Sequence, residues 1–177
     1  MNSGKNSPCV LGIVGAIWGV VGLSMILGRG LIAIYPYAVE LREYTFAWFH
    51  WVSLALSLLF MGYAEGYKGF QLKFSPRAAA RALYLLRNPT LLRVLFAPLF
   101  CMGYFHASRK RIIVSYSLTI GVVMLIILVG KMVQPWRGVV DAGVLLGLGW
   151  GLLSFWFFCL KAFFGKNFSV CPETLET

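Results

Sequence analysis

Few ionisable residues interrupt the long apolar runs of this sequence, and each of them is a candidate for function. Arg29 lies near the end of the run at 10–34, and Asp141 lies near the start of the run at 138–160. Ionisable side chains inside a membrane span are costly, so they usually mark a functional group or a buried ion pair. We expect Arg29 and Asp141 to pair, with Arg137, one turn earlier, as the competing partner. The alternative is an outward-facing site for an ion or small anion.

Three other residues could carry acid–base chemistry beyond the second apolar run. Glu65 and Lys68 have the three-residue spacing of a helical ion pair, and His106 lies just before three consecutive cations. If the protein has a cytoplasmic active site, Glu65, Lys68 and His106 are its catalytic candidates. This hypothesis rests on location alone, and the alternative is a surface ion pair with a histidine that faces lipid head groups.

Positive charge is concentrated in the middle of the chain. Nine of the sixteen Lys and Arg residues lie between positions 66 and 111, where there is no Asp or Glu. Such charge is retained on the cytoplasmic side of membrane spans and attracts anionic lipids. We therefore expect lipid head-group contacts from Arg77, Arg81, Arg109, Lys110 and Arg111. The net charge of +10 could also indicate nucleic acid, but no basic-aromatic pattern supports such a partner.

The elements that would position these residues are membrane helices. The chain has 177 residues, of which 59% are hydrophobic and only 12% are charged. A soluble domain usually has about 25% charged residues, and a helix needs roughly 17 apolar residues to cross a bilayer. We predict an all-α integral membrane protein with four transmembrane helices in two hairpins, at about 10–34, 45–64, 112–133 and 138–160. The chain forms a single membrane domain over 1–177, with a short polar tail at 161–177.

The segment at about 75–107, between the second and third spans, is predicted to lie at the cytoplasmic surface. Ser75 and Pro76 resemble a helix start, and Arg77 and Arg81 would share one face of a short amphipathic helix. The run at 94–105 has twelve residues and contains Pro98, which favours a re-entrant segment over a fifth span. A crossing there would also separate the basic cluster into two. Alternatively, this helix and a second short one at about 91–97 only cover the cytoplasmic ends of the spans.

The same charge pattern predicts the orientation. Four spans with the basic cluster inside place both termini in the cytoplasm, and we assign the protein to a bacterial inner membrane. The short turn at 131–137 would then be external although it carries two positive charges, which is a mild conflict.

Glycines spaced four apart mark helix surfaces that can approach closely, because lipid provides no hydrophobic drive between helices. They occur in the first span, at Gly15 and Gly19, and in the fourth, at Gly143, Gly147 and Gly151. We expect packing within the bundle. The alternative is a homodimer or an interface with a larger membrane complex.

The four cysteines show no C-x-x-C spacing, which gives no indication of a zinc site or a dithiol motif. Phosphate-loop, dinucleotide and metalloprotease motifs are also missing from the sequence. We expect free thiols, no bound metal and no cofactor.

Three functions fit these features. The first is a non-catalytic subunit or accessory factor of a membrane complex, favoured by small size, scarce polar residues and glycine strips. The second is a small oligomeric transporter or channel, and the third is a membrane enzyme acting on lipid at the cytoplasmic face. The sequence favours a non-catalytic protein over an enzyme without excluding the latter.

Overall fold

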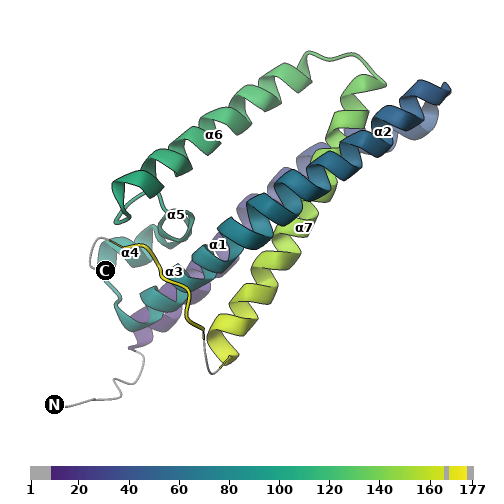
Figure 1. Cartoon of the computed structure of the whole chain (residues 1–177). Helices are drawn as coiled ribbons and strands as arrows, with labels where there is room; N and C mark the ends of the chain where they lie inside the picture. The colour runs from purple at the N-terminus through teal and green to yellow at the C-terminus, as the bar shows by residue number, and fades with distance from the viewer. Residues whose placement is uncertain (1–8, 166–167, 175–177) are drawn as a thin grey trace.

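The computed structural model describes residues 9–165 and 168–174, and every regular element in these ranges is helical (Figure 1). In chain order the elements are α1 (Val10–Val39), η1 (Glu40–Glu43), α2 (Trp48–Met61), the π-helix η2 (Gly62–Phe74), α3 (Ser75–Arg87), α4 (Leu91–Leu95), α5 (Ala97–Met102), α6 (Arg109–Gly130) and α7 (Trp136–Phe164).

Three helices are long and apolar enough to cross a membrane, namely Val10–Glu43, Arg109–Gly130 and Trp136–Phe164. They fit the prediction of a helical membrane protein. The first continues beyond the predicted end of its span at position 34 as far as Glu43. The predicted span at 45–64 is divided instead, because only 14 residues of α2 are α-helical before the chain changes to the wider π-helical turn of η2.

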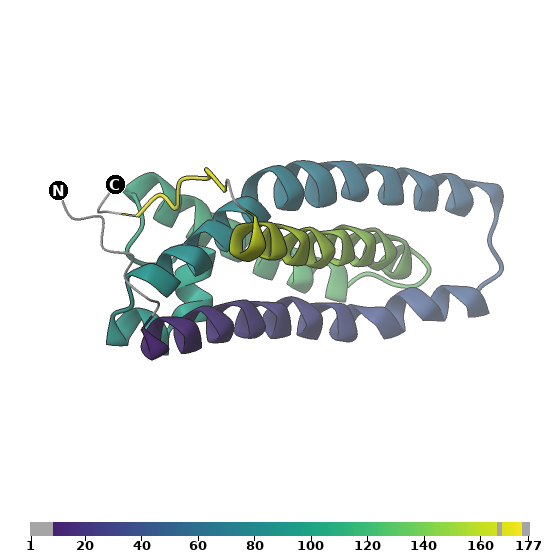
Figure 2. The ribbon, with the colours of Figure 1, turned by 90° about the horizontal axis from the view of Figure 1, so that it is seen from below.

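Helix α7 is the central element, with α1 and α2 on either side of it (Figure 2). Its glycine strip packs on α2 and η2 rather than on α1. A Cβ atom at Gly147 would lie 3.1 Å from Cβ of Glu65, and one at Gly151 only 2.5 Å from the ring of Phe70. At Gly143 it would collide with Ser57. These glycines are therefore occupied by contacts within the chain.

The glycines of α1 face a different set of neighbours. A Cβ atom at Gly15 would lie 2.8 Å from Val94, and one at Gly19 would lie 2.9 Å from Sγ of Cys101. These contacts bring the first half of α1 against α3, α4 and α5. The two glycine strips thus join α1 and α7 to separate partners and do not pair with each other.

The prediction of a surface helix in this segment is wrong, because α3 is largely buried. Ser75 and Phe74 both have α-helical backbone angles, so the chain continues from η2 into α3 without a break or a cap. Pro76 lies where the hydrogen bonding changes from the π-helical pattern of η2 to the α-helical pattern of α3. The small side chains of Ala78, Ala79 and Ala82 are fully buried, and α3 packs between α1 and α7.

The run at 94–105 forms two short helices rather than one segment. Phe96 separates α4 from α5, with φ −104° and ψ 33°, and Pro98 lies in the first turn of the second helix. Gly103 ends α5 with φ +87°, a conformation that favours glycine, and its amide donates to the carbonyls of Leu99 and Phe100. A side chain at this position would also meet Arg111.

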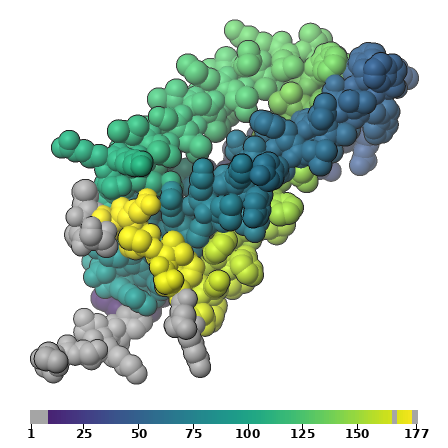
Figure 3. All heavy atoms as spheres, in the orientation of Figure 1, coloured from purple at the N-terminus to yellow at the C-terminus, as the bar shows by residue number. Residues whose placement is uncertain are grey.

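Helix α6 is held at its start and at its end. Near its start, Ser115 donates to the carbonyl of Met102 at 3.0 Å, and the hydroxyls of Tyr104 and Thr119 are hydrogen-bonded. At its far end a short turn leads into α7. Every residue from 120 to 128 is exposed. An opening separates the middle of α6 from α2 in the space-filling view (Figure 3).

The segment after α7 is also more than a polar tail. Residues 168–174 run back over α3, where they appear as a yellow strap in Figure 1. Thr174 is buried, and the carbonyls of Pro172 and Glu173 accept hydrogen bonds from Arg81.

Candidate functional site

Arg81 is buried, with only 1% of its surface exposed, so the expectation of a lipid head-group contact at this residue is wrong. Its guanidinium donates to four backbone carbonyls. Nη1 bonds to Phe100 at 2.6 Å, Nε to Pro172 at 2.9 Å, and Nη2 to His106 at 3.1 Å and Glu173 at 3.4 Å. One side chain therefore joins α3 to the end of α5, to the loop before α6 and to the C-terminal strap.

Two of these acceptors have unusual backbone conformations. Within the described ranges, His106 and Glu173 are the two non-glycine residues with positive φ, at 48° and 50°. A side chain in this left-handed region costs of order 1–2 kcal/mol. Both carbonyls bond to Nη2 of Arg81, so the guanidinium compensates for both strained turns.

Burial also affects the charge of Arg81. Desolvation lowers the pKa of this guanidinium to about 10, opposed in part by the Cys101 thiol and by Glu173. Nearby Arg111 and Arg93 lower the pKa further because they are like charges. Even so, Arg81 remains protonated at neutral pH, and all its N–H groups remain donors.

Sequence reasoning missed Arg93, which is only 5% exposed. Its guanidinium carbon lies 5.5 Å from the Tyr84 ring centroid and 5.9 Å from that of Phe100, and Arg81 lies 4.8 Å from the same Phe100 ring. Such cation–π contacts favour partly desolvated arginines. The sequence signal for its burial was the pattern of α4, in which the leucines take the exposed side of the helix and the arginine takes the opposite side.

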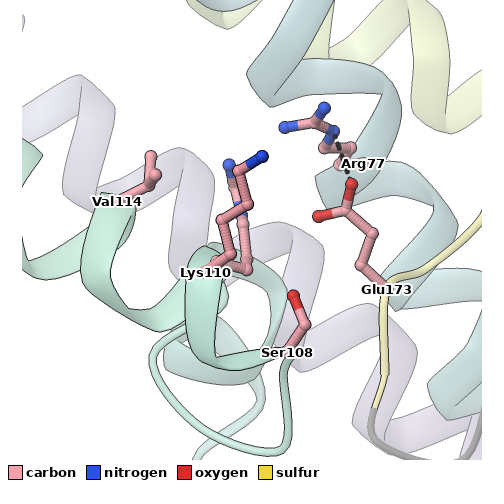
Figure 4. A pocket seen from close by; sticks show the side chains of 6 residues that line it. Arg77, Ser108, Lys110, Val114 and Glu173 are labelled. Carbon is pink, nitrogen blue, oxygen red and sulfur yellow. Dashed lines mark ion pairs between the residues drawn. The ribbon is translucent and has the colours of Figure 1, made fainter.

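A small pocket of about 190 Å³ opens beside the start of α6. It is lined by Arg77, Ser108, Lys110, Arg111, Val114 and Glu173. Nε of Arg77 lies 3.4 Å from a carboxylate oxygen of Glu173, and Figure 4 shows Lys110 and Ser108 directed toward the same space. Of the predicted head-group residues, Arg77, Lys110 and Arg111 thus share one pocket, while Arg109 is exposed beside it.

At the other end of the bundle, Asp141 pairs with Arg137 instead of Arg29. Nε of Arg137 lies 3.6 Å from Asp141, and its guanidinium stacks 3.4 Å from the Tyr37 ring centroid. Arg29 is exposed on α1. The glycines of α7 pack this helix on α2 and η2. Asp141 therefore pairs with Arg137, the competing partner on the same helix.

The three catalytic candidates lie in different surroundings. Lys68 lies 4.8 Å above the Tyr63 ring rather than against Glu65, because three residues do not complete a turn in the wide η2 helix. His106 contributes its backbone carbonyl to Arg81. Within the described ranges no hydrogen bond or ion pair joins Glu65, Lys68 and His106, and no group of three His, Cys, Asp or Glu could hold a metal ion.

The four described cysteines are free, and they form two classes. Cys101 and Cys159 are buried, whereas Cys9 and Cys171 are exposed. Burial raises the pKa of the Cys101 thiol to about 12, and the nearby Cys159 raises it further. Because thiol reagents react with the thiolate, Cys101 is expected to stay unmodified in the folded protein.

Comparison with known proteins gives no assignment. No protein-family model matches the chain, and no curated protein or solved structure matches it. The function must therefore be argued from the geometry.

Proposed function

We propose that the protein is a non-catalytic subunit or accessory factor of a membrane complex, and that α6 is the helix that contacts the partner. The observation that carries this proposal is the exposed middle of α6, from 120 to 128, which is apolar on all sides. In Figure 1 this helix lies apart from α1, α2 and α7.

Two small residues leave a shallow gap on the exposed surface of α6, which we call the notch. It favours a protein partner over lipid alone. Ser117 and Gly121 are four residues apart on α6, and Ser117 is exposed. A Cβ atom at Gly121 would meet nothing within 4 Å. Small residues at this spacing let a second helix approach closely. In α1 and α7 the glycines at this spacing are already used within the chain, whereas this pair is free.

The proposal includes the membrane arrangement. We propose that the chain crosses the membrane four times. The three long apolar helices make three crossings, and α2 with the start of η2 makes the fourth. Helices α4 and α5 form a re-entrant pair. The exposed side chains of Leu91, Leu92, Leu95 and Phe96 support contact of this pair with lipid. Both termini then face the cytoplasm of a bacterial cell, and Arg109 and Lys110 meet anionic lipid at the inner surface of the membrane.

The exposed cysteines test this orientation. In intact cells, a membrane-impermeant maleimide should leave Cys9 and Cys171 unlabelled, and both should react once the inner membrane is permeabilised. Cys101 and Cys159 should react only after denaturation, because they are buried. Mass spectrometry of the labelled peptides reads out each site. Labelling of Cys9 or Cys171 in intact cells would contradict the orientation.

Native mass spectrometry after purification in mild detergent tests the partner. We expect a discrete complex with a membrane protein, which dissociates in the Gly121→Leu variant because the leucine fills the notch. The melting temperature should not fall, since nothing in the chain contacts this position. Gly130→Leu is the matched control, because Gly130 also faces open space on α6 but lies outside the notch. A wild-type protein that is always monomeric would contradict the proposal.

A further inference from the structure

The pocket at the start of α6 has an excess of positive charge. Among the described residues that line it, Arg77, Lys110 and Arg111 are cations and Glu173 is the one carboxylate. Arg81 adds a fourth cation directly behind the strap that carries Glu173. Cations held close together in a partly desolvated site are unfavourable unless an anion neutralises them. One carboxylate leaves most of this charge unbalanced.

Arg111 shows where the missing anion would bind. It is only 9% exposed, and it lines the pocket. In the part of the chain that the structure describes, no hydrogen bond or ion pair involves its guanidinium. Most of the Arg111 side chain is packed away, and its N–H groups are left available to the pocket, so its position indicates a ligand that brings oxygen atoms. The side chain of Ser108 does not cap α6, and the hydroxyl is directed into the same space (Figure 4).

Glu173 already occupies this pocket with its side chain. Its carboxylate lies 3.4 Å from Nε of Arg77, and both side chains are about one-third exposed, at 35% and 36%. Its backbone is held separately, because its carbonyl accepts from Arg81 and from the amide of Ser108 at 3.3 Å. The carboxylate can therefore leave the pocket by a side-chain rotation while the strap stays in place.

We propose that this pocket binds a phosphate group and that Glu173 occupies it as a built-in competitor. A phosphate monoester carries up to two charges and three acceptor oxygens, so it satisfies more of the cations than a carboxylate does. Arginine is suited to this exchange because its planar fork binds carboxylate and phosphate in the same way. Binding of the phosphate displaces the Glu173 side chain from Arg77.

The surroundings of the pocket favour a lipid as the source of the phosphate. Val114 forms its apolar wall, and Ile113 and Leu118 continue an exposed apolar surface along α6. An acyl chain could follow this surface while the head group lies among the cations. The lipid source rests on the proposed placement of this end at the inner membrane surface, whereas phosphate binding does not.

Binding to the purified full-length protein in detergent tests the inference without reference to orientation. The probes are dihexanoyl phosphatidic acid, inorganic phosphate and, as the zwitterionic control, dihexanoyl phosphatidylcholine. We expect phosphatidic acid to bind more tightly than phosphatidylcholine. Lys110→Gln should weaken its binding about fivefold, the effect of losing an exposed charge pair of roughly 1 kcal/mol. Glu173→Gln should strengthen binding about as much, because the competitor is gone.

Arg87→Gln is the control, since Arg87 is an exposed cation of α3 that does not line the pocket. It should change binding less than twofold. If inorganic phosphate binds with the same dependence on Lys110 and Glu173 and the lipid does not, the pocket takes a soluble phosphate. Equal losses in Lys110→Gln and Arg87→Gln, or no gain in Glu173→Gln, would overturn the inference. These results would leave the proposed partner and orientation unaffected, because those are tested by mass spectrometry and by cysteine labelling.

Discussion

Replacing Arg81 by lysine is expected to lower the melting temperature of the detergent-solubilised protein by about 10 °C. Lysine keeps the charge but donates from a single nitrogen, so it cannot reach all four carbonyls that Arg81 bonds. Disrupting a buried charged network of this kind costs about 3–5 kcal/mol. For a chain of this length, each kcal/mol changes the melting temperature by about 2–4 °C.

A thiol-reactive fluorescent maleimide can follow this unfolding, because Cys101 and Cys159 become accessible when the core opens. Arg87→Lys is the matched control, since Arg87 is on the same helix but is exposed. Its melting temperature should remain within about 2 °C of the wild type, as surface substitutions usually do. Equal stability of the Arg81 and Arg87 variants would show that the hydrogen bonds of Arg81 do not hold the strap and loop.

Alanine substitutions at two glycines of α7 should have different effects on the stability of the protein. Gly151→Ala is expected to destabilise the protein by about 1–3 kcal/mol, since the added methyl group would overlap the Phe70 ring in a tightly packed contact. That corresponds to a fall of about 5 °C in melting temperature. Gly149→Ala should be neutral or slightly stabilising, because its Cβ would meet nothing within 4 Å and alanine favours the helix.

Both variants lie on the same helix, two residues apart, so they differ mainly in which side of α7 they occupy. The same maleimide assay measures them. If Gly151→Ala were as stable as Gly149→Ala, α7 and η2 would not approach as closely as described.

The long apolar helices were the part of the fold that the sequence predicted best. Each is defined by local composition, since about 20 apolar residues in a row have few alternatives to a membrane helix. The third and fourth predicted spans, 112–133 and 138–160, overlap α6 and α7 with small shifts at the ends. The second was harder to predict, because a change from α- to π-helical hydrogen bonding in η2 has no distinct hydropathy pattern.

The position of Arg81 could not be predicted from its own segment. On a helical wheel it shares a face with Arg77, which suggested a basic surface. Its acceptors are far away in sequence, at Phe100 and in the strap at Pro172 and Glu173. The usable signal was the alanines surrounding it, since a helix with small residues on several sides is suited to burial between other helices.

The phosphate pocket likewise combines residues that only the fold brings together. Its cations could be found in the sequence as a basic cluster, and Arg77, Lys110 and Arg111 were among the predicted head-group residues. No sequence pattern connects them with Glu173, which is 62 residues or more from each of them. The predicted pair of Arg29 and Asp141 failed because the competing partner, Arg137, lies one turn from Asp141 on the same helix and forms the ion pair.

Contact of α6 with another membrane protein is the central proposal for this chain, and site-specific photo-crosslinking in the native membrane measures this contact directly. A photoreactive amino acid at Leu125, one turn beyond Gly121 on the same face of α6, should form an adduct with one discrete protein. The same amino acid at Leu59, an exposed position on α2, should give no such adduct. If Leu125 forms adducts only with lipid, or gives the same pattern as Leu59, the proposed role as a partner-binding membrane subunit is contradicted.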